Sequence, residues 1–257
     1  MIEKLVAIIL PMYNEELSVP ALRSMFERGI PLPQGCDYRI IIINDGSSDA
    51  TLQKVMEWAK RDSRVTILSH TENKGLGQAI LTGFYEAVRM NSTYIVTMDA
   101  DATRPGGLIG ALVQALLEGA EIAIASRFVK GGEQKGVPSF RRLLNFGARK
   151  YYRLVFPLAG VSDYTVNFRA YRAELIKSAF DKVDGPLLAS GSFTTVAELL
   201  LKLATLCRKI SEVPMVLQYD RKKSRSKLGI AASALDSIKL CMLPKEKCPL
   251  GKGLRIS

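Results

Sequence analysis

Short apolar runs alternate with helix-like stretches through the first half of this 257-residue chain. We expect the apolar runs to form strands at Leu5–Leu10, Arg39–Ile43, Val65–Leu68, Tyr94–Met98 and Ile122–Ala125. The helix-like stretches lie near residues 15–28, 50–60, 76–90 and 106–118. Strands rich in Val, Ile and Leu that alternate with helices indicate a parallel sheet buried on both faces. The sequence therefore predicts an α/β fold with a mostly parallel central sheet, covered by helices on both sides.

Three of these expected strands end in polar loops, which are Pro11–Glu15, Asn44–Asp49 and Asp99–Asp101. Parallel sheets bind ligands at the carboxyl ends of their strands, so the three loops should line one edge. Asp99 and Asp101 are two residues apart, which places them on the same side of an extended backbone. Two carboxylates so close together need a neutralising cation, and Mg²⁺ is held by one or two carboxylates plus substrate phosphates. We expect a divalent metal here.

The net charge of +11 is unevenly distributed. Residues 1–129 hold 12 Lys and Arg against 15 Asp and Glu, a charge of −3, so residues 130–257 carry +14. A basic half of this kind suits nucleic acid, anionic lipid headgroups or a phosphorylated acceptor. No nucleic-acid-binding motif is recognisable, so we expect no nucleic-acid partner. Residues 139–156 mix arginines with aromatic residues, which fits either a helix at a membrane interface or an ordinary surface helix.

Several other kinds of site are disfavoured by composition. His70 is the only histidine, and we interpret it as an ordinary strand-end residue. The four cysteines include no CxxC pair, so we expect reduced thiols in a cytoplasmic protein rather than a disulfide scaffold. The longest charge-free stretches have 13 residues. A membrane-spanning helix needs about 20.

Nine motifs in order carry a resemblance to a known family. They are Pro11–Glu15, Asn44–Asp49, Gly75–Ala79, Met98–Asp101, Ser126–Phe128, Asp163–Arg172, Glu212–Pro214, Asp220–Arg221 and Ser226–Gly229. The chain resembles family-two glycosyltransferases of the GT-A fold, and most closely the dolichol-phosphate mannose synthases and related polyprenyl-phosphate glycosyltransferases. The resemblance implies a GT-A catalytic domain at residues 1–229. A Rossmann-like sugar-nucleotide half (1–129) would precede a basic acceptor half (130–229), followed by a C-terminal helix and flexible tail (230–257).

The same resemblance implies roles for individual residues. The donor's base and ribose would be surrounded by Pro11, Tyr13, Glu15 and Asp45, while Asp99 and Asp101 would bind Mg²⁺ or Mn²⁺ on its diphosphate. Phosphate groups would be met by Arg127, Arg141, Arg221 and Lys227. Asp101, Arg127 and Asp163 would be catalytic. Asn44, Thr103, Asn167, Ser224 and Arg225 depart from the family pattern.

The implied reaction is the inverting transfer of a hexose from a nucleotide-diphosphate sugar, of the GDP-mannose or UDP-glucose type, to a polyprenyl phosphate. A phosphate acceptor is mostly ionised at neutral pH, since its second pKa is about 6, and it needs cations rather than a base. A hydroxyl acceptor, the alternative, needs a carboxylate base, for which Asp163 is the best candidate.

Other interpretations remain beside this one. A sugar-nucleotide pyrophosphorylase would resemble its relatives through a Gly-rich basic loop where this chain has Pro11–Glu15. A non-catalytic sugar-nucleotide sensor stays open. With a lipid acceptor, we expect peripheral contact with an anionic membrane on its cytoplasmic face, through residues 139–156 and 228–243.

Overall fold

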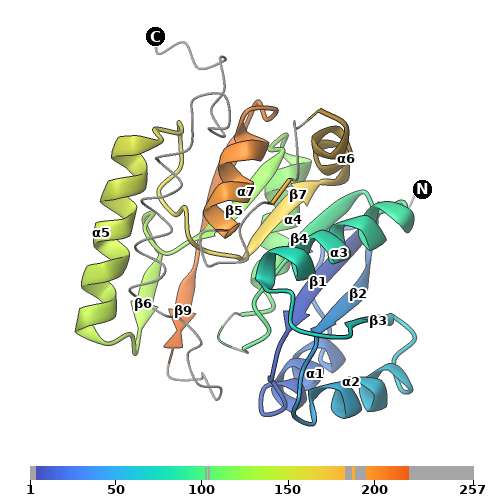
Figure 1. Ribbon diagram of the computed structural model, residues 1–257. Coiled ribbons are helices and arrows are strands. Elements are labelled where there is room, and N and C mark those ends of the chain that lie inside the picture. Colours follow the sequence, from blue (N-terminus) through green and yellow to red (C-terminus); the bar gives the residue numbers. More distant parts are fainter. Residues whose placement is uncertain (1–3, 102, 104, 183–186, 189–194, 220–257) are drawn as a thin grey trace.

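The computed structural model describes residues 4–101, 103, 105–182, 187–188 and 195–219, which form a central sheet with helices around it (Figure 1). The seven strands of this sheet lie in the order β3-β2-β1-β4-β7-β5-β8. They are β1 (Lys4–Met12), β2 (Cys36–Asp45), β3 (Val65–His70), β4 (Tyr94–Thr97), β5 (Ile122–Ser126), β7 (Arg169–Arg172) and β8 (Ile210–Pro214). All neighbours are parallel except β7, which is antiparallel to β4 and β5. The predicted fold class is confirmed.

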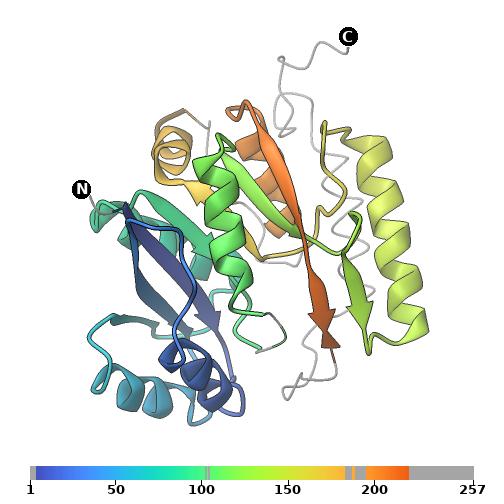
Figure 2. The ribbon, with the colours of Figure 1, turned by 180° about the vertical axis from the view of Figure 1, so that it is seen from behind.

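Helices cover both faces of this sheet. On one face lie α3 (Leu76–Arg89), α6 (Ala173–Lys182) and α7 (Thr195–Ala204), which contact one another in front of the sheet in Figure 1. On the other face, seen in Figure 2, lie α1 (Val19–Glu27), α2 (Thr51–Ala59) and α4 (Leu108–Leu117). Phe26 of α1 packs against Trp58 of α2, with ring centroids 5.7 Å apart. The central strands are therefore buried on both sides, which explains their continuous apolar sequence.

The chain changes direction across the sheet between β1 and β4. From β1 it continues to β2 and β3 on one side, and it then returns to β4 on the other side of β1. In the register of β1 and β4, Ile9 lies opposite Thr97, so the loops that follow both strands leave the same edge. Ligands of open α/β sheets bind at such a switch point. The topology thus places the Pro11–Glu15 and Asp99–Asp101 loops together.

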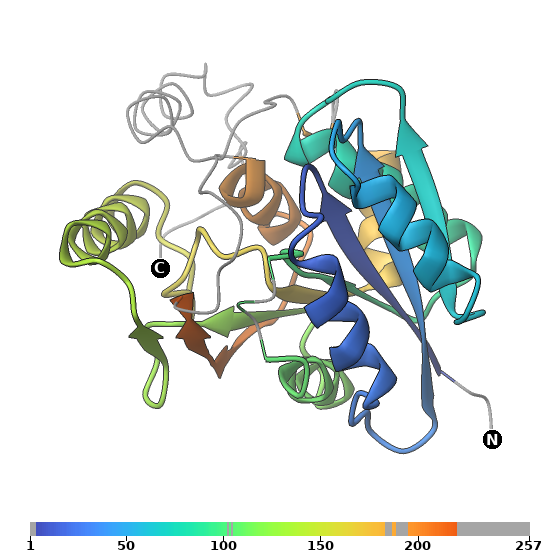
Figure 3. The same ribbon diagram turned by 90° about the horizontal axis from the view of Figure 1, so that it is seen from below.

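Beyond β5 the chain forms a smaller unit at the side of the sheet. Strands β6 (Glu133–Lys135) and β9 (Val216–Gln218) pair in parallel, and helix α5 (Ser139–Val155) lies next to them at the periphery (Figures 1 and 3). Of the residues in α5, only Tyr152 is buried. This helix therefore exposes most of its surface, unlike the helices that cover the sheet.

The predicted strands and helices of the first half are all present, but the second half differs from expectation. In this half, β8 ends at Pro214 and β9 begins at Val216, and the two strands belong to different sheets. Strand β7 and helix α6 were not expected. The helix considered at 139–156 is present as α5.

Residues 228–243 and the tail at 230–257 lie outside the described residues. The boundary between the two halves of the 1–229 unit stays a prediction. Within the described part of the chain, no helix is both long enough and apolar enough to cross a bilayer.

Helix α4 packs so closely on the loop after α1 that Gly110 has no room for a side chain. A Cβ at Gly110 would overlap the carbonyl oxygen of Pro31, whereas one at Gly107 would lie 4.0 Å from the nearest atom, Pro31 Cγ. We expect Gly110→Ala to lower the free energy of unfolding by about 1–3 kcal/mol through overpacking. Gly107→Ala is the matched control and should change it by less than about 0.5 kcal/mol. Urea unfolding measures both, and equal stability of the two variants would contradict this packing.

Candidate functional site

The loops that follow β1 and β2 are joined to each other by hydrogen bonds. The Asn14 N–H donates to Ser47 Oγ (3.0 Å), and the Ser48 N–H donates to Asn14 Oδ1 (2.9 Å). Asn14 has a positive φ of 49°, which turns the chain sharply after β1. The Glu15 N–H then donates to Thr51 Oγ1 (2.8 Å) at the start of α2. Two of the three polar loops predicted to converge are therefore in direct contact.

Four residues predicted to surround a donor's base and ribose lie on these loops. Pro11 is the penultimate residue of β1, opposite Ile43, and Tyr13 follows the strand. Both are partly buried. Glu15 is buried, and its Oε2 accepts a hydrogen bond from Ser18 Oγ (2.8 Å). These three residues and Asp45 therefore lie at one edge, and their role toward a donor stays a prediction.

Asp45 has a structural function that the sequence interpretation missed. Its carboxylate accepts from the backbone N–H groups of Lys74 and Gly75 (both 2.9 Å). It also contacts His70 Nδ1 at 2.7 Å, and His70 Nε2 lies 2.9 Å from Thr82 Oγ1. This carboxylate therefore fastens the loop between β3 and α3 to the end of β2. His70 is accordingly a nearly buried bridge rather than an ordinary strand-end residue.

Asp99 and Asp101 follow β4 directly, and a different residue orients each carboxylate. Asp99 Oδ1 accepts from Asn167 Nδ2 (3.1 Å), whereas Asp101 Oδ1 accepts from Thr103 Oγ1 (2.6 Å) and from the Thr103 N–H (3.2 Å). Asn167 comes just before β7, and its carbonyl oxygen accepts from Thr97 Oγ1 (3.0 Å). Asn167 and Thr103, which depart from the family pattern, thus hold the two acidic side chains in place.

This pair of carboxylates fits a hard divalent cation such as Mg²⁺ or Mn²⁺. The donors are all oxygen, and hydrogen bonds from neighbouring groups fix the ligand orientation, as in known metal sites. In the described part of the chain, no three His, Cys, Asp or Glu side chains gather as a metal cage. A cation held by Asp99 and Asp101 would keep coordination positions open for substrate oxygens and water.

Arg127 and Asp163 form a buried ion pair at the end of β5. Arg127 Nε and Nη2 donate to the two oxygens of Asp163 at 2.7 and 2.8 Å, and the Arg127 N–H donates at 3.2 Å. The side chain of Asp163 is fully buried and that of Arg127 is 9% exposed. Burial on its own would raise the pKa of Asp163, but the charge and hydrogen bonds of Arg127 outweigh burial and lower this pKa below its ordinary value.

The proposed use of Asp163 as a general base is therefore not supported by its environment. A buried carboxylate with a lowered pKa, whose oxygens are both bound to Arg127, is a weak and inaccessible base. Glu212 Oε1 holds the same loop from the other side, accepting from the N–H groups of Ser162 (2.9 Å) and Asp163 (2.8 Å). Asp163 is better described as the residue that positions Arg127.

One short loop connects this ion pair to the acidic pair. Asp163, at its start, binds Arg127, and Asn167, four residues later, binds Asp99. Four residues of extended chain span at most about 14 Å. The structure therefore brings Arg127 and Asp99 into one region, at the ends of β5 and β4.

Of the other three residues predicted to contact phosphate, only Arg141 lies among the described residues. Arg141 lies on α5, with its Cζ 5.6 Å from the centroid of the Tyr219 ring. Arg221 and Lys227 lie outside the described residues. Their predicted contacts with phosphate therefore stay predictions.

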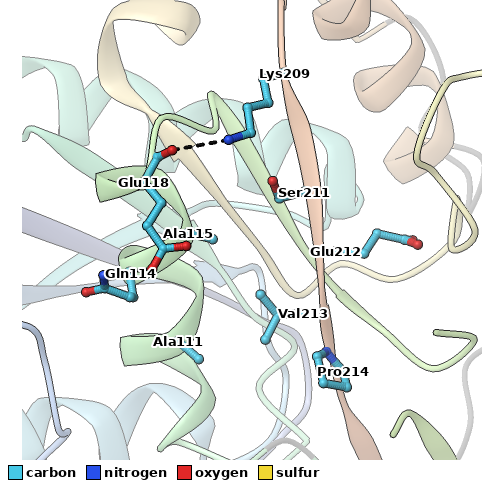
Figure 4. Close-up of a pocket in the computed structure, with 9 residues that line it drawn as sticks. All are labelled: Ala111, Gln114, Ala115, Glu118, Lys209, Ser211, Glu212, Val213 and Pro214. Atoms are coloured by element: carbon cyan, nitrogen blue, oxygen red, sulfur yellow. Dashed lines mark hydrogen bonds between the residues drawn. The ribbon is translucent and has the colours of Figure 1, made fainter. Parts of the chain in front are cut away.

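A surface hollow lies elsewhere, between α4 and the edge strand β8 (Figure 4). It is lined by Ala111, Gln114, Ala115, Glu118, Lys209, Ser211, Glu212, Val213 and Pro214. Lys209 Nζ donates across it to the Glu118 carbonyl oxygen (3.2 Å), and the Glu212 carboxylate points away from α4. It includes none of the predicted site residues.

The ion pair leads to a stability prediction for Asp163→Asn. Because this change leaves the nearly buried Arg127 without its counter-ion, we expect a loss of about 3–5 kcal/mol in unfolding free energy at neutral pH. The pKa of Asp163 is lower in the folded protein than its ordinary value of 3.8. The extra unfolding free energy of the wild type is therefore complete above pH 3.8, and it is lost as the pH falls through the folded-state pKa of Asp163. Urea unfolding, followed by the fluorescence of the single buried tryptophan, Trp58, measures the difference. A pH-independent difference would contradict the ion-pair explanation.

Comparison with known proteins identifies the family and the fold of this chain. The family described as "Glycosyl transferase family 2" matches residues 7–180. A dolichol-phosphate mannosyltransferase of Pyrococcus furiosus is 33% identical over 224 residues, covering 87% of this chain and 59% of that protein. A polyprenol monophosphomannose synthase of Mycolicibacterium smegmatis is 29% identical over 236 residues, covering 91% of this chain and 83% of that protein. The chain thus spans less than two thirds of the first relative and most of the second.

Solved structures share the fold. Glucosyl-3-phosphoglycerate synthase from Mycobacterium tuberculosis, in complex with Mn²⁺, UDP-glucose and phosphoglyceric acid, superposes with a TM-score of 0.68 at 19% identity. The match covers 94% of this chain and 81% of that one. The predicted GT-A architecture is confirmed. Since the family match includes well over half of the sequence, the chain belongs to glycosyl transferase family 2.

Proposed function

We propose that this protein is an inverting, metal-dependent glycosyltransferase that moves a hexose from a nucleotide-diphosphate sugar to a polyprenyl phosphate. Family membership supports glycosyl transfer. The acceptor class is supported by the names of several relatives, which include an undecaprenyl-phosphate mannosyltransferase of Micrococcus luteus at 27% identity. The structural observation that supports a phosphate acceptor is the buried ion pair between Asp163 and Arg127.

The donor would bind at the edge formed by the loops after β1, β2 and β4. Asp99 and Asp101 would hold Mg²⁺ or Mn²⁺, which supplies charge neutralisation for a departing diphosphate. Their orientation by Asn167 and Thr103 keeps both carboxylates in place before the donor arrives. Pro11, Tyr13 and Glu15 line the edge where the nucleoside would lie, and Asp45 would shape this site by holding the loop before α3.

The class of acceptor is inferred from the ion pair between Asp163 and Arg127, which lies near the acidic pair. Asp163 is bound to Arg127 and cannot readily take a proton from a hydroxyl. A phosphate monoester is largely ionised at neutral pH and requires no base. Arg127 would provide the cation that orients it, through the N–H groups that Asp163 does not occupy. The arrangement thus favours a phosphate acceptor over a hydroxyl acceptor.

A lipid-linked acceptor also requires contact with a membrane, and α5 has the surface for it. Three large apolar side chains on this helix are strongly exposed: Phe140 (62%), Leu143 (66%) and Leu154 (84%). The helix contains five Arg and Lys residues and no Asp or Glu. Each basic residue near an anionic bilayer contributes about 1 kcal/mol. We propose that α5 lies in the interface of the cytoplasmic membrane face, with these apolar side chains inserted.

The metal and donor roles are tested by Asp99→Asn and Asp101→Asn. Each should lower sugar transfer at least about 100-fold, since charge stabilisation in the transition state is lost. Asp37→Asn, at the exposed start of β2, is the control and should keep full activity. The readout is transfer of labelled sugar, from a panel of nucleotide sugars with Mg²⁺ or Mn²⁺, to a short polyprenyl phosphate in detergent.

The same assay separates the alternatives. Polyprenyl phosphate should be glycosylated and the matching polyprenol should not. Full activity in excess chelator would rule out the metal role. Preferred use of the polyprenol would overturn the phosphate acceptor, and donor binding without transfer or hydrolysis would indicate a sensor.

The membrane role of α5 is tested by the double variant Leu143→Glu, Leu154→Glu. Burying one Leu side chain is worth about 1.5–3 kcal/mol, so binding to vesicles that contain anionic lipid should fall more than tenfold. Leu17→Glu is the matched control, because Leu17 is also exposed (54%) but lies before α1. Co-sedimentation at low salt measures binding. Undiminished sedimentation of the double variant would exclude α5 as the membrane contact.

A further inference from the structure

Two arginines from different elements lie over one aromatic ring. Phe128 follows β5, and its ring centroid is 5.3 Å from Cζ of Arg127 and 4.9 Å from Cζ of Arg149 on α5. The two guanidinium carbons are therefore at most about 10 Å apart, which is the sum of the two distances. The Phe128 ring therefore links Arg149 on the peripheral helix α5 to Arg127 at the end of β5.

The two arginines differ in how their charge is balanced. Arg127 is neutralised by Asp163. Arg149 pairs with no carboxylate within the described residues, and its Nε is a buried donor without a hydrogen-bond acceptor. A buried charged donor that lacks an acceptor is unfavourable, so structures retain one where a ligand supplies the acceptor or strain is tolerated for function. An anion beside Phe128 would satisfy both the charge and the N–H group.

Other polar side chains on the inner side of α5 also suit the binding of an anion. Arg141, Asn145 and Arg149 are spaced by four residues and lie on one side of the helix, where all three are partly buried. Asn145 Nδ2 donates to Gln134 Oε1 (2.7 Å), and Arg141 stacks on Tyr219. The exposed Leu143 and Leu154 occupy the opposite side. The inner side of α5 therefore presents these polar groups beside the buried Tyr152, whereas Leu143 and Leu154 face away from the protein.

We propose that Arg149 is a phosphate-positioning residue which, together with Arg127 across the Phe128 ring, binds the phosphate monoester of the lipid acceptor. The proposal rests on the polyprenyl-phosphate function proposed above and adds to it a residue that the motifs did not indicate. The Arg149 fork and the N–H groups of Arg127 that Asp163 does not occupy offer donors from two directions, so they orient the phosphate as well as attract it. The same helix would then contact the membrane with its outer side and the acceptor's headgroup with its inner side.

The test compares three variants of the full chain in detergent with Mg²⁺. Arg149→Gln should raise the acceptor KM about tenfold or more at saturating donor, because a charged hydrogen bond is lost, and leave the donor KM unchanged. Arg149→Lys should recover part of the loss, since Lys keeps the charge without the fork. Arg61→Gln, an exposed arginine just after α2, is the control and should leave both KM values unchanged. Thermal unfolding midpoints show whether each variant is folded.

Direct binding separates this inference from the proposed function. Calorimetry with farnesyl phosphate, in the absence of donor, should show weaker binding for Arg149→Gln than for the wild type. If the wild type transfers sugar to polyprenyl phosphate and Arg149→Gln is unaltered in acceptor KM and binding, the role of Arg149 is overturned. Equal increases in donor and acceptor KM would assign Arg149 a general structural role and likewise overturn it. A wild type that neither binds nor glycosylates any polyprenyl phosphate overturns the proposed function instead.

Discussion

The buried ion pair between Arg127 and Asp163 is the interaction on which the proposed acceptor side of the site depends. Both partners are nearly or fully removed from solvent, and removing one would leave an uncompensated charge in the interior. The pair fixes Arg127 at the end of β5, and it leaves Asp163 with both carboxylate oxygens bound to a cation. One contact therefore positions a cation and disfavours Asp163 as a base toward the proposed acceptor. That restriction, more than the overall basic charge, favours an acceptor that arrives already ionised.

The inserted antiparallel strand β7 explains how distant parts of the sequence meet. It lies between β4 and β5, so the loop before it passes between the ends of both strands. Asn167 orients Asp99 from this loop, and Asp163 orients Arg127 from the same loop. Asp99 of the acidic pair and Arg127 are thereby held by one segment of backbone. Two substrates that both carry phosphate can approach each other only if such charges are fixed in place, since their mutual repulsion is otherwise unopposed.

Helix α5, at the side of the sheet, contacts residues next to the Arg127–Asp163 ion pair. Its inner arginines reach Phe128 and Tyr219, while its leucines face outward. An exposed apolar side is unfavourable in water and favourable in a lipid interface, so the helix is suited to a surface between protein and membrane. The likeness in fold to an enzyme whose complex contains phosphoglyceric acid shows that the fold alone does not select a lipid acceptor. The residues on α5 and around Phe128 are where such a choice would be made.

The sequence alone determined the parallel core, the strands that end in polar loops, and the carboxylates Asp99 and Asp101 at one edge. These follow from local patterns, because a strand buried on both faces must be apolar along its length. Strand β7 escaped prediction because its four residues, Arg169–Arg172, include two arginines, and the burial of Arg169 depends on carbonyl groups of Tyr164 and Val196. The partners of Asp45, Asp99 and Arg127 were likewise decided only by tertiary structure. Each contact joins residues 25 to 68 positions apart, and no local pattern encodes which distant group will neutralise a buried charge.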